Sequence, residues 1–221
     1  MRALALLVAK DLRVEWHNRR RLLSLLLFGA ALAVVVGYSY RTRADLPATL
    51  PTLIWMLTVF LQLIFLGQSY QAEVENSCFD GLRLSPVPRW RIGLAKVLAD
   101  VLLVSLADVL VLAMVAFLTG TLEPLAPGLL LLLAIETVGV ISLGNLLFGC
   151  TAAGESPAID LYALVLLLSA PLILFGPDAA HGLFEGHDPA RLSLYFLFLG
   201  VYALALLGVA AVAYKDFIKG S

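Results

Sequence analysis

The chain has 221 residues, of which 61% are hydrophobic and 14% are charged, and its formal net charge is −1 at pH 7. Soluble domains are typically about 45–50% apolar and about 25% charged, so a soluble fold of this size could not bury so much apolar surface. The composition excludes a soluble globular protein. The net charge identifies no partner because the charges are clustered, and we expect no binding to nucleic acid.

Residues 1–20 predict an amphipathic helix rather than a membrane span. Leu4, Val8, Leu12 and Trp16 recur every four positions and therefore share one helical face. Basic residues lie away from the centre of this stripe: Arg2, Lys10, Arg13 and Arg20. We expect this helix to lie in the inner membrane interface. The alternative is a cytoplasmic extension of the first span.

Six later segments are approximately long enough to cross the hydrocarbon core, which takes roughly 20 apolar residues. They are Leu22–Tyr38, Leu50–Tyr70, Ile92–Thr119, Leu129–Cys150, Ile159–Phe175 and Leu192–Tyr214. The fifth is short and contains Pro171 near its end. The alternating strands of a membrane barrel are not seen. The sequence therefore predicts an all-α integral membrane protein with six transmembrane helices in a single transmembrane domain over residues 1–221.

The basic residues predict the orientation of this bundle. If the N-terminus is cytoplasmic, the outer loops contain only Arg41, Arg43 and Arg191, and the other twelve of the fifteen Lys and Arg residues lie inside. Cytoplasmic loops of membrane proteins carry an excess of Lys and Arg. We therefore expect a multi-pass protein with both termini in the cytoplasm.

The longest polar stretch, residues 71–91, lies on the predicted inner side. It contains acidic residues, then a glycine, a leucine and a Ser-Pro pair: Glu73, Glu75, Asp80, Gly81, Leu84, Ser85 and Pro86. The acidic part can form a short helix, the glycine can end or bend it, and the Ser-Pro pair indicates a turn. We expect a short helix across the membrane face, suited to transmitting force from a soluble partner into the bundle.

This stretch resembles the haem exporter protein B family, the membrane subunit of the cytochrome c maturation ABC transporter. The similarity lies in Asp80-Gly81, then Ser85-Pro86, a basic run, and Gly93-Leu94-Ala95-Lys96. Residues 11–15, 50–55 and 171–176 also have counterparts in the family, and so do the six spans and the length. The resemblance implies an ABC-2-like permease bundle in the bacterial inner membrane. It also implies an ABC ATPase partner, other haem-handling membrane subunits and a periplasmic haem chaperone.

The chain contains no G-x-x-x-x-G-K-[ST] motif, so it lacks this kind of phosphate-binding loop. We therefore expect ATP to bind a separate subunit and this chain to be non-catalytic. Two alternatives to haem export remain. The chain could be a membrane scaffold that recruits an ATPase to release loaded haem chaperone, or an ABC-2 permease with another cargo. An intramembrane enzyme is disfavoured because the spans contain no Ser-His pair, paired catalytic aspartates or H-E-x-x-H motif.

Several acids fall within or at the ends of the predicted spans: Asp100, Asp108, Glu136 and Asp160. Charged residues inside membranes are costly and often functional. They could form a polar path or contact a partner, or they could be protonated or paired acids that fix the helix packing. Asp160 could also simply be an acid at a helix N-terminus.

Haem iron is often held by histidine. His181 and His187 lie in the last predicted outer loop, residues 176–191, and are the candidate haem ligands, although such residues are more often solvated. Cys78 and Cys150 form no C-x-x-C pair. We expect no bound cofactor or metal, with haem only as a candidate cargo and a mainly mechanical role for the chain.

Small residues at a spacing of four occur in the first span, at Gly29, Ala33 and Gly37. Such a stripe allows close approach of another helix. It could serve packing within the chain or a homodimer, and the sequence leaves both open.

Overall fold

The computed structural model describes residues 2–17, 19–42, 49–75, 88–151, 158–186 and 189–217. All regular structure in these ranges is helical. In chain order the elements are α1 (Arg2–His17), α2 (Arg19–Thr42), α3 (Leu50–Glu75), α5 (Arg89–Thr119), η2 (Glu123–Leu125), α6 (Pro127–Thr151), α7 (Ala158–Leu168), α8 (Ala170–Phe184) and α9 (Pro189–Phe217).

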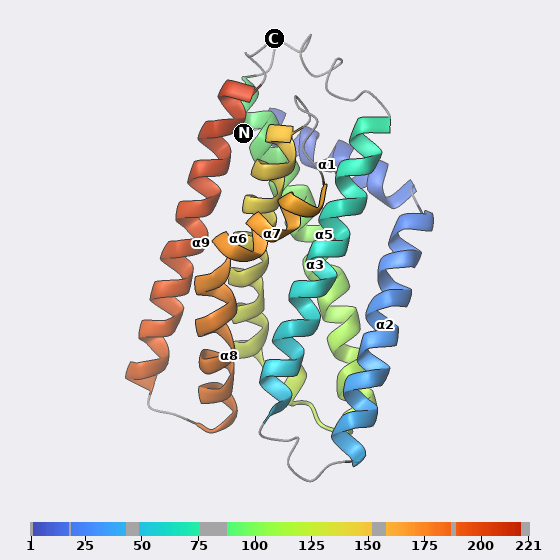
Figure 1. The fold of residues 1–221 in the computed structure, drawn as a ribbon, viewed down its shortest axis with the longest axis vertical. Helices are drawn as coiled ribbons and strands as arrows, with labels where there is room; N and C mark the ends of the chain where they lie inside the picture. Colours follow the sequence, from blue (N-terminus) through green and yellow to red (C-terminus); the bar gives the residue numbers. More distant parts are fainter. Residues whose placement is uncertain are drawn as a thin grey trace.

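Five of these helices, α2, α3, α5, α6 and α9, are long and apolar enough to cross a membrane. Helices α7 and α8 are long and apolar enough only as a pair, which is bent by 51° and has the geometry of a broken span or a re-entrant loop. The predicted all-α membrane fold is therefore confirmed, and the described chain contains the predicted six spans where this bent pair counts as one. Helix α1 crosses one end of the bundle, and α9 finishes at that same end (Figure 1).

Helices α3, α5 and α6 form the centre of the bundle. Helix α6 packs against α3, α5, α7, α8 and α9, while α5 packs against α1, α2, α3, α6 and α9. The span in α3 is 72% buried and the span in α6 is 67% buried, whereas the values are 28% for α2 and 17% for α9. The two outer spans therefore present most of their apolar side chains to lipid, and polar side chains in the centre are shielded from it.

The small-residue stripe of α2 packs against α5. A Cβ at Gly29 would lie 2.5 Å from Cγ2 of Val111, and one at Gly37 would lie 2.5 Å from Cβ of Leu118. Ala33, between them, is fully buried. Of the two alternatives for this stripe, the structure therefore supports packing within the chain.

The break between α7 and α8 is caused by Pro171, which has no N–H and cannot continue a helical hydrogen-bond ladder. The N–H of Leu172 donates to the carbonyl of Ser169 at 2.9 Å instead of to that of Leu168. The hydroxyl of Tyr202 in α9 donates to the freed Leu168 carbonyl at 2.5 Å. The bend therefore leaves this carbonyl paired, as the interior of a membrane requires.

The predicted end of the fifth span at Phe175, and the outer loop over residues 176–191, were wrong. Helix α8 continues through Gly176 and Pro177 to Phe184. Pro177 forfeits one backbone hydrogen bond, but Gly176 lets the ring of Trp55 lie directly against the helix, since a Cβ there would lie 1.9 Å from Cζ2 of Trp55. Gly-Pro therefore marks a packing contact at this site rather than a loop.

The described ends of the predicted coupling segment, residues 71–91, belong to the two neighbouring helices. Residues 71–75 are the last turn of α3, and residues 89–91 are the first turn of α5. Residues 71–75 thus extend α3 beyond its apolar span, which ends at Ser69. Residues 76–87 lie outside the described part of the chain.

Candidate functional site

A buried polar cluster joins the three central helices near the middle of their length. It consists of Gln62 from α3, Asp108 from α5, and Glu136 and Thr137 from α6, and each is at most 3% exposed. The amide Nε2 of Gln62 donates to Oε2 of Glu136 at 2.8 Å and to Oγ1 of Thr137 at 3.1 Å. The Thr137 hydroxyl lies 3.3 Å from Oδ2 of Asp108 and 2.8 Å from the Leu133 carbonyl oxygen. We call these four residues the deep layer.

Acceptors outnumber donors in the deep layer. The Gln62 amide offers two hydrogens and the Thr137 hydroxyl offers one, while an ionised carboxylate only accepts. Within the described part of the chain, three buried oxygens of this cluster have no hydrogen-bond partner: Oε1 of Gln62, Oδ1 of Asp108 and Oε1 of Glu136. Buried polar atoms are normally paired, so these three oxygens call for an explanation.

A second polar cluster joins the same helices nearer to the end where α1 lies. It contains Ser69 of α3, Lys96 and Asp100 of α5, and Asn145 of α6. The Lys96 ammonium forms an ion pair with Asp100 at 3.4 Å and donates to the Ser69 hydroxyl at 3.1 Å. The Asn145 amide donates to Oδ2 of Asp100 at 3.0 Å. We call this group the paired layer, because its one negative charge faces one positive charge.

The two layers are stacked along one seam between α3, α5 and α6. Asp100 and Asp108 are eight residues apart on α5, about 12 Å along the helix, and so are Thr137 and Asn145 on α6. Midway between the two polar residues of each helix lies a fully buried apolar residue, which is Val104 on α5 and Ile141 on α6. Leu66 of α3 also lies in this layer, against the backbone of Gly144. One apolar layer therefore separates the two polar ones.

The structure places the predicted intramembrane acids as follows. Asp108 and Glu136 belong to one cluster, whereas Asp100 is held by Lys96 in the other. The side chain of Asp160 lies outside the described residues. Sequence reasoning missed the uncharged members of both layers. The available signal was a polar residue interrupting an apolar span: Gln62, Ser69, Thr137 and Asn145.

The candidate haem ligands are not brought together within the described chain. His181 lies in α8, and its Nδ1 is 3.5 Å from Oε1 of Glu185 one turn further along the helix. His187 lies outside the described residues. No group of three His, Cys, Asp or Glu side chains in the described ranges could hold a metal ion.

The predicted ATPase-coupling residues cannot be placed in the same way. Glu73 and Glu75 lie on the last turn of α3, where only the backbone is described. The remaining ones fall outside the described chain: Asp80, Gly81, Leu84, Ser85 and Pro86.

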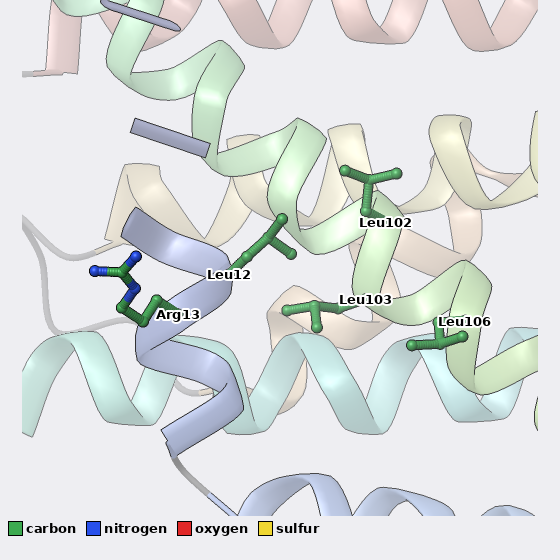
Figure 2. Close-up of a pocket in the computed structure, with 5 residues that line it drawn as sticks. All are labelled: Leu12, Arg13, Leu102, Leu103 and Leu106. Atoms are coloured by element: carbon green, nitrogen blue, oxygen red, sulfur yellow. The ribbon is translucent and has the colours of Figure 1, made fainter. Parts of the chain in front are cut away.

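A groove of about 400 Å³ lies between α1 and α5 and is lined by Leu12, Arg13, Leu102, Leu103 and Leu106. Leu12 points from α1 toward α5, while the guanidinium of Arg13 points away from the leucines (Figure 2). Leu102 and Leu106 are about half exposed. The groove is a lipid-facing apolar surface, and its lining contains no histidine, cysteine or methionine that could ligate haem iron.

Comparison with known proteins identifies the family. The chain is 28% identical over 210 residues to heme exporter protein B of Pseudomonas aeruginosa, and the alignment covers 95% of this chain and 94% of that protein. The resemblance to the haem exporter protein B family is thus confirmed. Residues 2–177 match the family described as ABC-2 type transporter, so the match includes α1, the spans of α2, α3, α5 and α6, and α7, and it ends within α8. The chain therefore belongs to the ABC-2 type transporter family.

Proposed function

We propose that the chain is the permease subunit of an ABC-type haem exporter for c-type cytochrome biogenesis. It would transmit the conformational change driven by a separate ATPase subunit across the bacterial inner membrane. The observation that carries this proposal is the similarity to heme exporter protein B, which runs over almost the full length of both chains. A likeness confined to one span would support membrane insertion only.

The architecture supports a mechanical role. The apolar outer helices α2 and α9 pack against the central helices α3, α5 and α6, which share the polar seam. Movements of the central helices would therefore rearrange hydrogen bonds that are shielded from lipid. Helices α3 and α5 also flank residues 76–87, where we place the contact with the ATPase. A push on this connection would act directly on two of the three central helices.

The surroundings of His181 also support a mechanical role for this chain. His181 already pairs with Glu185 on its own helix, and the apolar groove offers haem iron no ligand. We therefore propose that other haem-handling membrane subunits and a periplasmic haem chaperone bind the haem, and that this chain supplies the movement for its transfer.

The ATPase contact is tested by Asp80→Lys in a strain whose own copy of the gene is deleted. We expect the variant to insert normally but to lose co-purification with the ATPase and the maturation of c-type cytochromes. The matched control is Glu123→Lys, an equal change of charge on an exposed acid of η2, which lies between the end of α5 and the start of α6. Normal ATPase binding by the Asp80 variant would contradict this site of contact.

Haem handling is tested separately with His181→Ala and His187→Ala combined. We expect c-type cytochromes to mature nearly as in the wild type, because neither residue is proposed to bind the cargo. Loss of maturation with normal insertion and complex assembly would show direct handling of haem by this chain.

The orientation is tested by single cysteines in a chain whose own Cys78 and Cys150 are replaced by serine. A cysteine at Ser77 should react with a membrane-impermeant reagent only from the cytoplasmic side. A cysteine at Asp178, an exposed position of α8, should react only from the other side. The reverse pattern would contradict cytoplasmic termini.

A further inference from the structure

We propose that the deep layer is a binding site for one proton, which the Asp108 and Glu136 carboxyl groups hold inside the bundle. The site comprises Gln62, Asp108, Glu136 and Thr137, and its ligand is a proton that supplies the missing O–H donor. This inference concerns the buried seam and does not depend on which cargo is exported.

The first argument is the count of hydrogen atoms. The three available hydrogens of Gln62 and Thr137 are directed to Glu136, Thr137 and either Leu133 or Asp108. Three buried oxygens then remain without a donor. One of these oxygens belongs to the Gln62 amide, whose nitrogen contacts Glu136 and Thr137, so the orphan amide oxygen lies in the same cluster as the orphan carboxylate oxygens. A carboxyl proton adds one donor where only acceptors are present.

The second argument is charge. Two ionised carboxylates would place two negative charges in one buried cluster, and uncompensated charge inside a membrane is costly. Within the described chain, no cationic side chain bonds to the deep layer. The described side chains of α3 include no titratable group, and Glu136 is the only one of α6. On the neighbouring helices, Lys96 pairs with Asp100 and His181 pairs with Glu185. Tyr202 donates to the Leu168 carbonyl.

The third argument separates a proton from a metal cation. Hard cations such as Mg²⁺ and Ca²⁺ take about six to eight oxygen ligands. Among the described residues, the deep layer offers three oxygens without a partner. No group of three or more His, Cys, Asp or Glu side chains in the described ranges could hold a metal ion. A proton requires only one carboxyl oxygen and one acceptor nearby, which this cluster provides.

The seam also indicates the side from which the proton exchanges. Toward the end where α1 lies, only the layer of Leu66, Val104 and Ile141 separates the deep layer from Asp100 and Lys96. In the other direction α5 and α6 continue with buried apolar side chains, among them Leu112, Val115, Leu129 and Leu132. The proton should therefore exchange through the Leu66 layer.

The test is infrared spectroscopy of the full chain in phospholipid nanodiscs at neutral pH. A protonated carboxylic acid has a carbonyl band separate from that of a carboxylate, and the band shifts in D₂O. We expect such a band in the wild type and its loss in the variant Asp108→Asn/Glu136→Gln. The matched control is Asp100→Asn, which should keep the band because Asp100 is paired with Lys96. Absence of the band from the wild type, or its loss only in the control, would overturn the proposal.

Two measurements on the wild-type chain test the proposal even if the double variant does not fold. Labelling all aspartate or all glutamate carboxyl carbons with ¹³C should shift the acid band in at least one of the two samples. The unfolding temperature should be the same in Na⁺, K⁺ and choline salts of equal ionic strength. A carboxylate spectrum without an acid band, together with stabilisation by Na⁺ or K⁺, would assign the site to a metal cation and refute a proton.

The exchange route is tested by the rate at which the acid band shifts after transfer to D₂O. Leu66→Ala should accelerate the shift several-fold, because it opens the layer next to Asp100. Leu112→Ala, a truncation of equal size one turn beyond Asp108 on α5, should leave the rate near that of the wild type. Equal or greater acceleration by the Leu112 variant would overturn the assigned route.

Discussion

The paired layer and the deep layer differ in how they balance charge, although the same three helices build both. In the paired layer Asp100 has an ammonium group at 3.4 Å and an amide donor at 3.0 Å. In the deep layer Asp108 and Glu136 share donors from one amide and one hydroxyl, and each keeps an oxygen without a partner. The paired layer lies closer to the end of the spans, where a lysine side chain can reach toward the interface.

This difference explains what each layer can contribute. A lysine opposite an aspartate fixes three helices at one register, because separating them would leave a buried charge unpaired. A carboxyl pair without a fixed cation depends on a small exchangeable ion. The paired layer is therefore suited to holding the helices together, and the deep layer to a change of state within the same seam.

The largest effect is expected from Lys96→Met. Removing the cation leaves Asp100, which is 1% exposed, with the Asn145 amide as its one side-chain donor among the described residues, so the free energy of unfolding should fall by about 3 kcal/mol. Titration with SDS in mixed micelles measures this change. The double variant Lys96→Met/Asp100→Asn removes both charges and should recover part of the loss. A double variant less stable than the single one would show that the pair is not what stabilises this layer.

An intermediate effect is expected from Gln62→Leu, which removes the two hydrogen bonds to Glu136 and Thr137. Hydrogen bonds between membrane helices contribute about 0.6 kcal/mol each on average, so the free energy of unfolding should fall by about 1 kcal/mol. Gln68→Leu is the control on the same helix, because the one side-chain bond of Gln68 to the described residues is a 3.4 Å bond to Ser24. An equal fall in the free energy of unfolding in both variants would show that the hydrogen bonds of the Gln62 amide do not stabilise the seam.

The smallest effect is expected from Asp108→Asn. If the carboxyl pair already holds a proton, an uncharged amide of similar size should change the free energy of unfolding by less than about 1 kcal/mol. Asp100→Asn should cost more, since it leaves the ammonium of Lys96 without its carboxylate. The same micelle titration measures both variants. A larger loss for Asp108→Asn than for Asp100→Asn would reverse the comparison between the layers.

The helical membrane class and the spans of α2, α3, α5, α6 and α9 could be predicted from the sequence, because a long apolar run in a membrane must satisfy its backbone hydrogen bonds as a helix. The sequence also marked Asp100, Asp108 and Glu136, since each acid interrupts such a run. It could not show that Asp108 and Glu136 meet while Asp100 does not join them, because that depends on how α5 and α6 are rotated and offset. Gln62 carries no charge, so nothing in the α3 run indicated that it faces both acids.

The extent of α8 shows a second limit. Gly176 and Pro177, a pair common in loops, were predicted to begin an outer loop that also contains His181 and His187. Trp55, some 120 residues earlier in the chain, packs against Gly176 and stabilises the helix there. A contact so distant in sequence cannot be read from the local pattern, and it changes His181 from a loop residue into a helical one.

The hydrogen bond from Tyr202 to the Leu168 carbonyl has a consequence for how motion would spread. The bend of 51° between α7 and α8 exposes this carbonyl, and α9 supplies its donor. Moving α9 alone would leave this carbonyl unpaired in hydrocarbon, which costs several kcal/mol. Straightening the bend would return the Leu172 N–H to the Leu168 carbonyl and would leave the Tyr202 hydroxyl without this acceptor. The bend is thus a stiff joint rather than a loose one. A displacement that begins at α7 would be carried sideways into α9, the least buried span, and so would reach the lipid-facing surface.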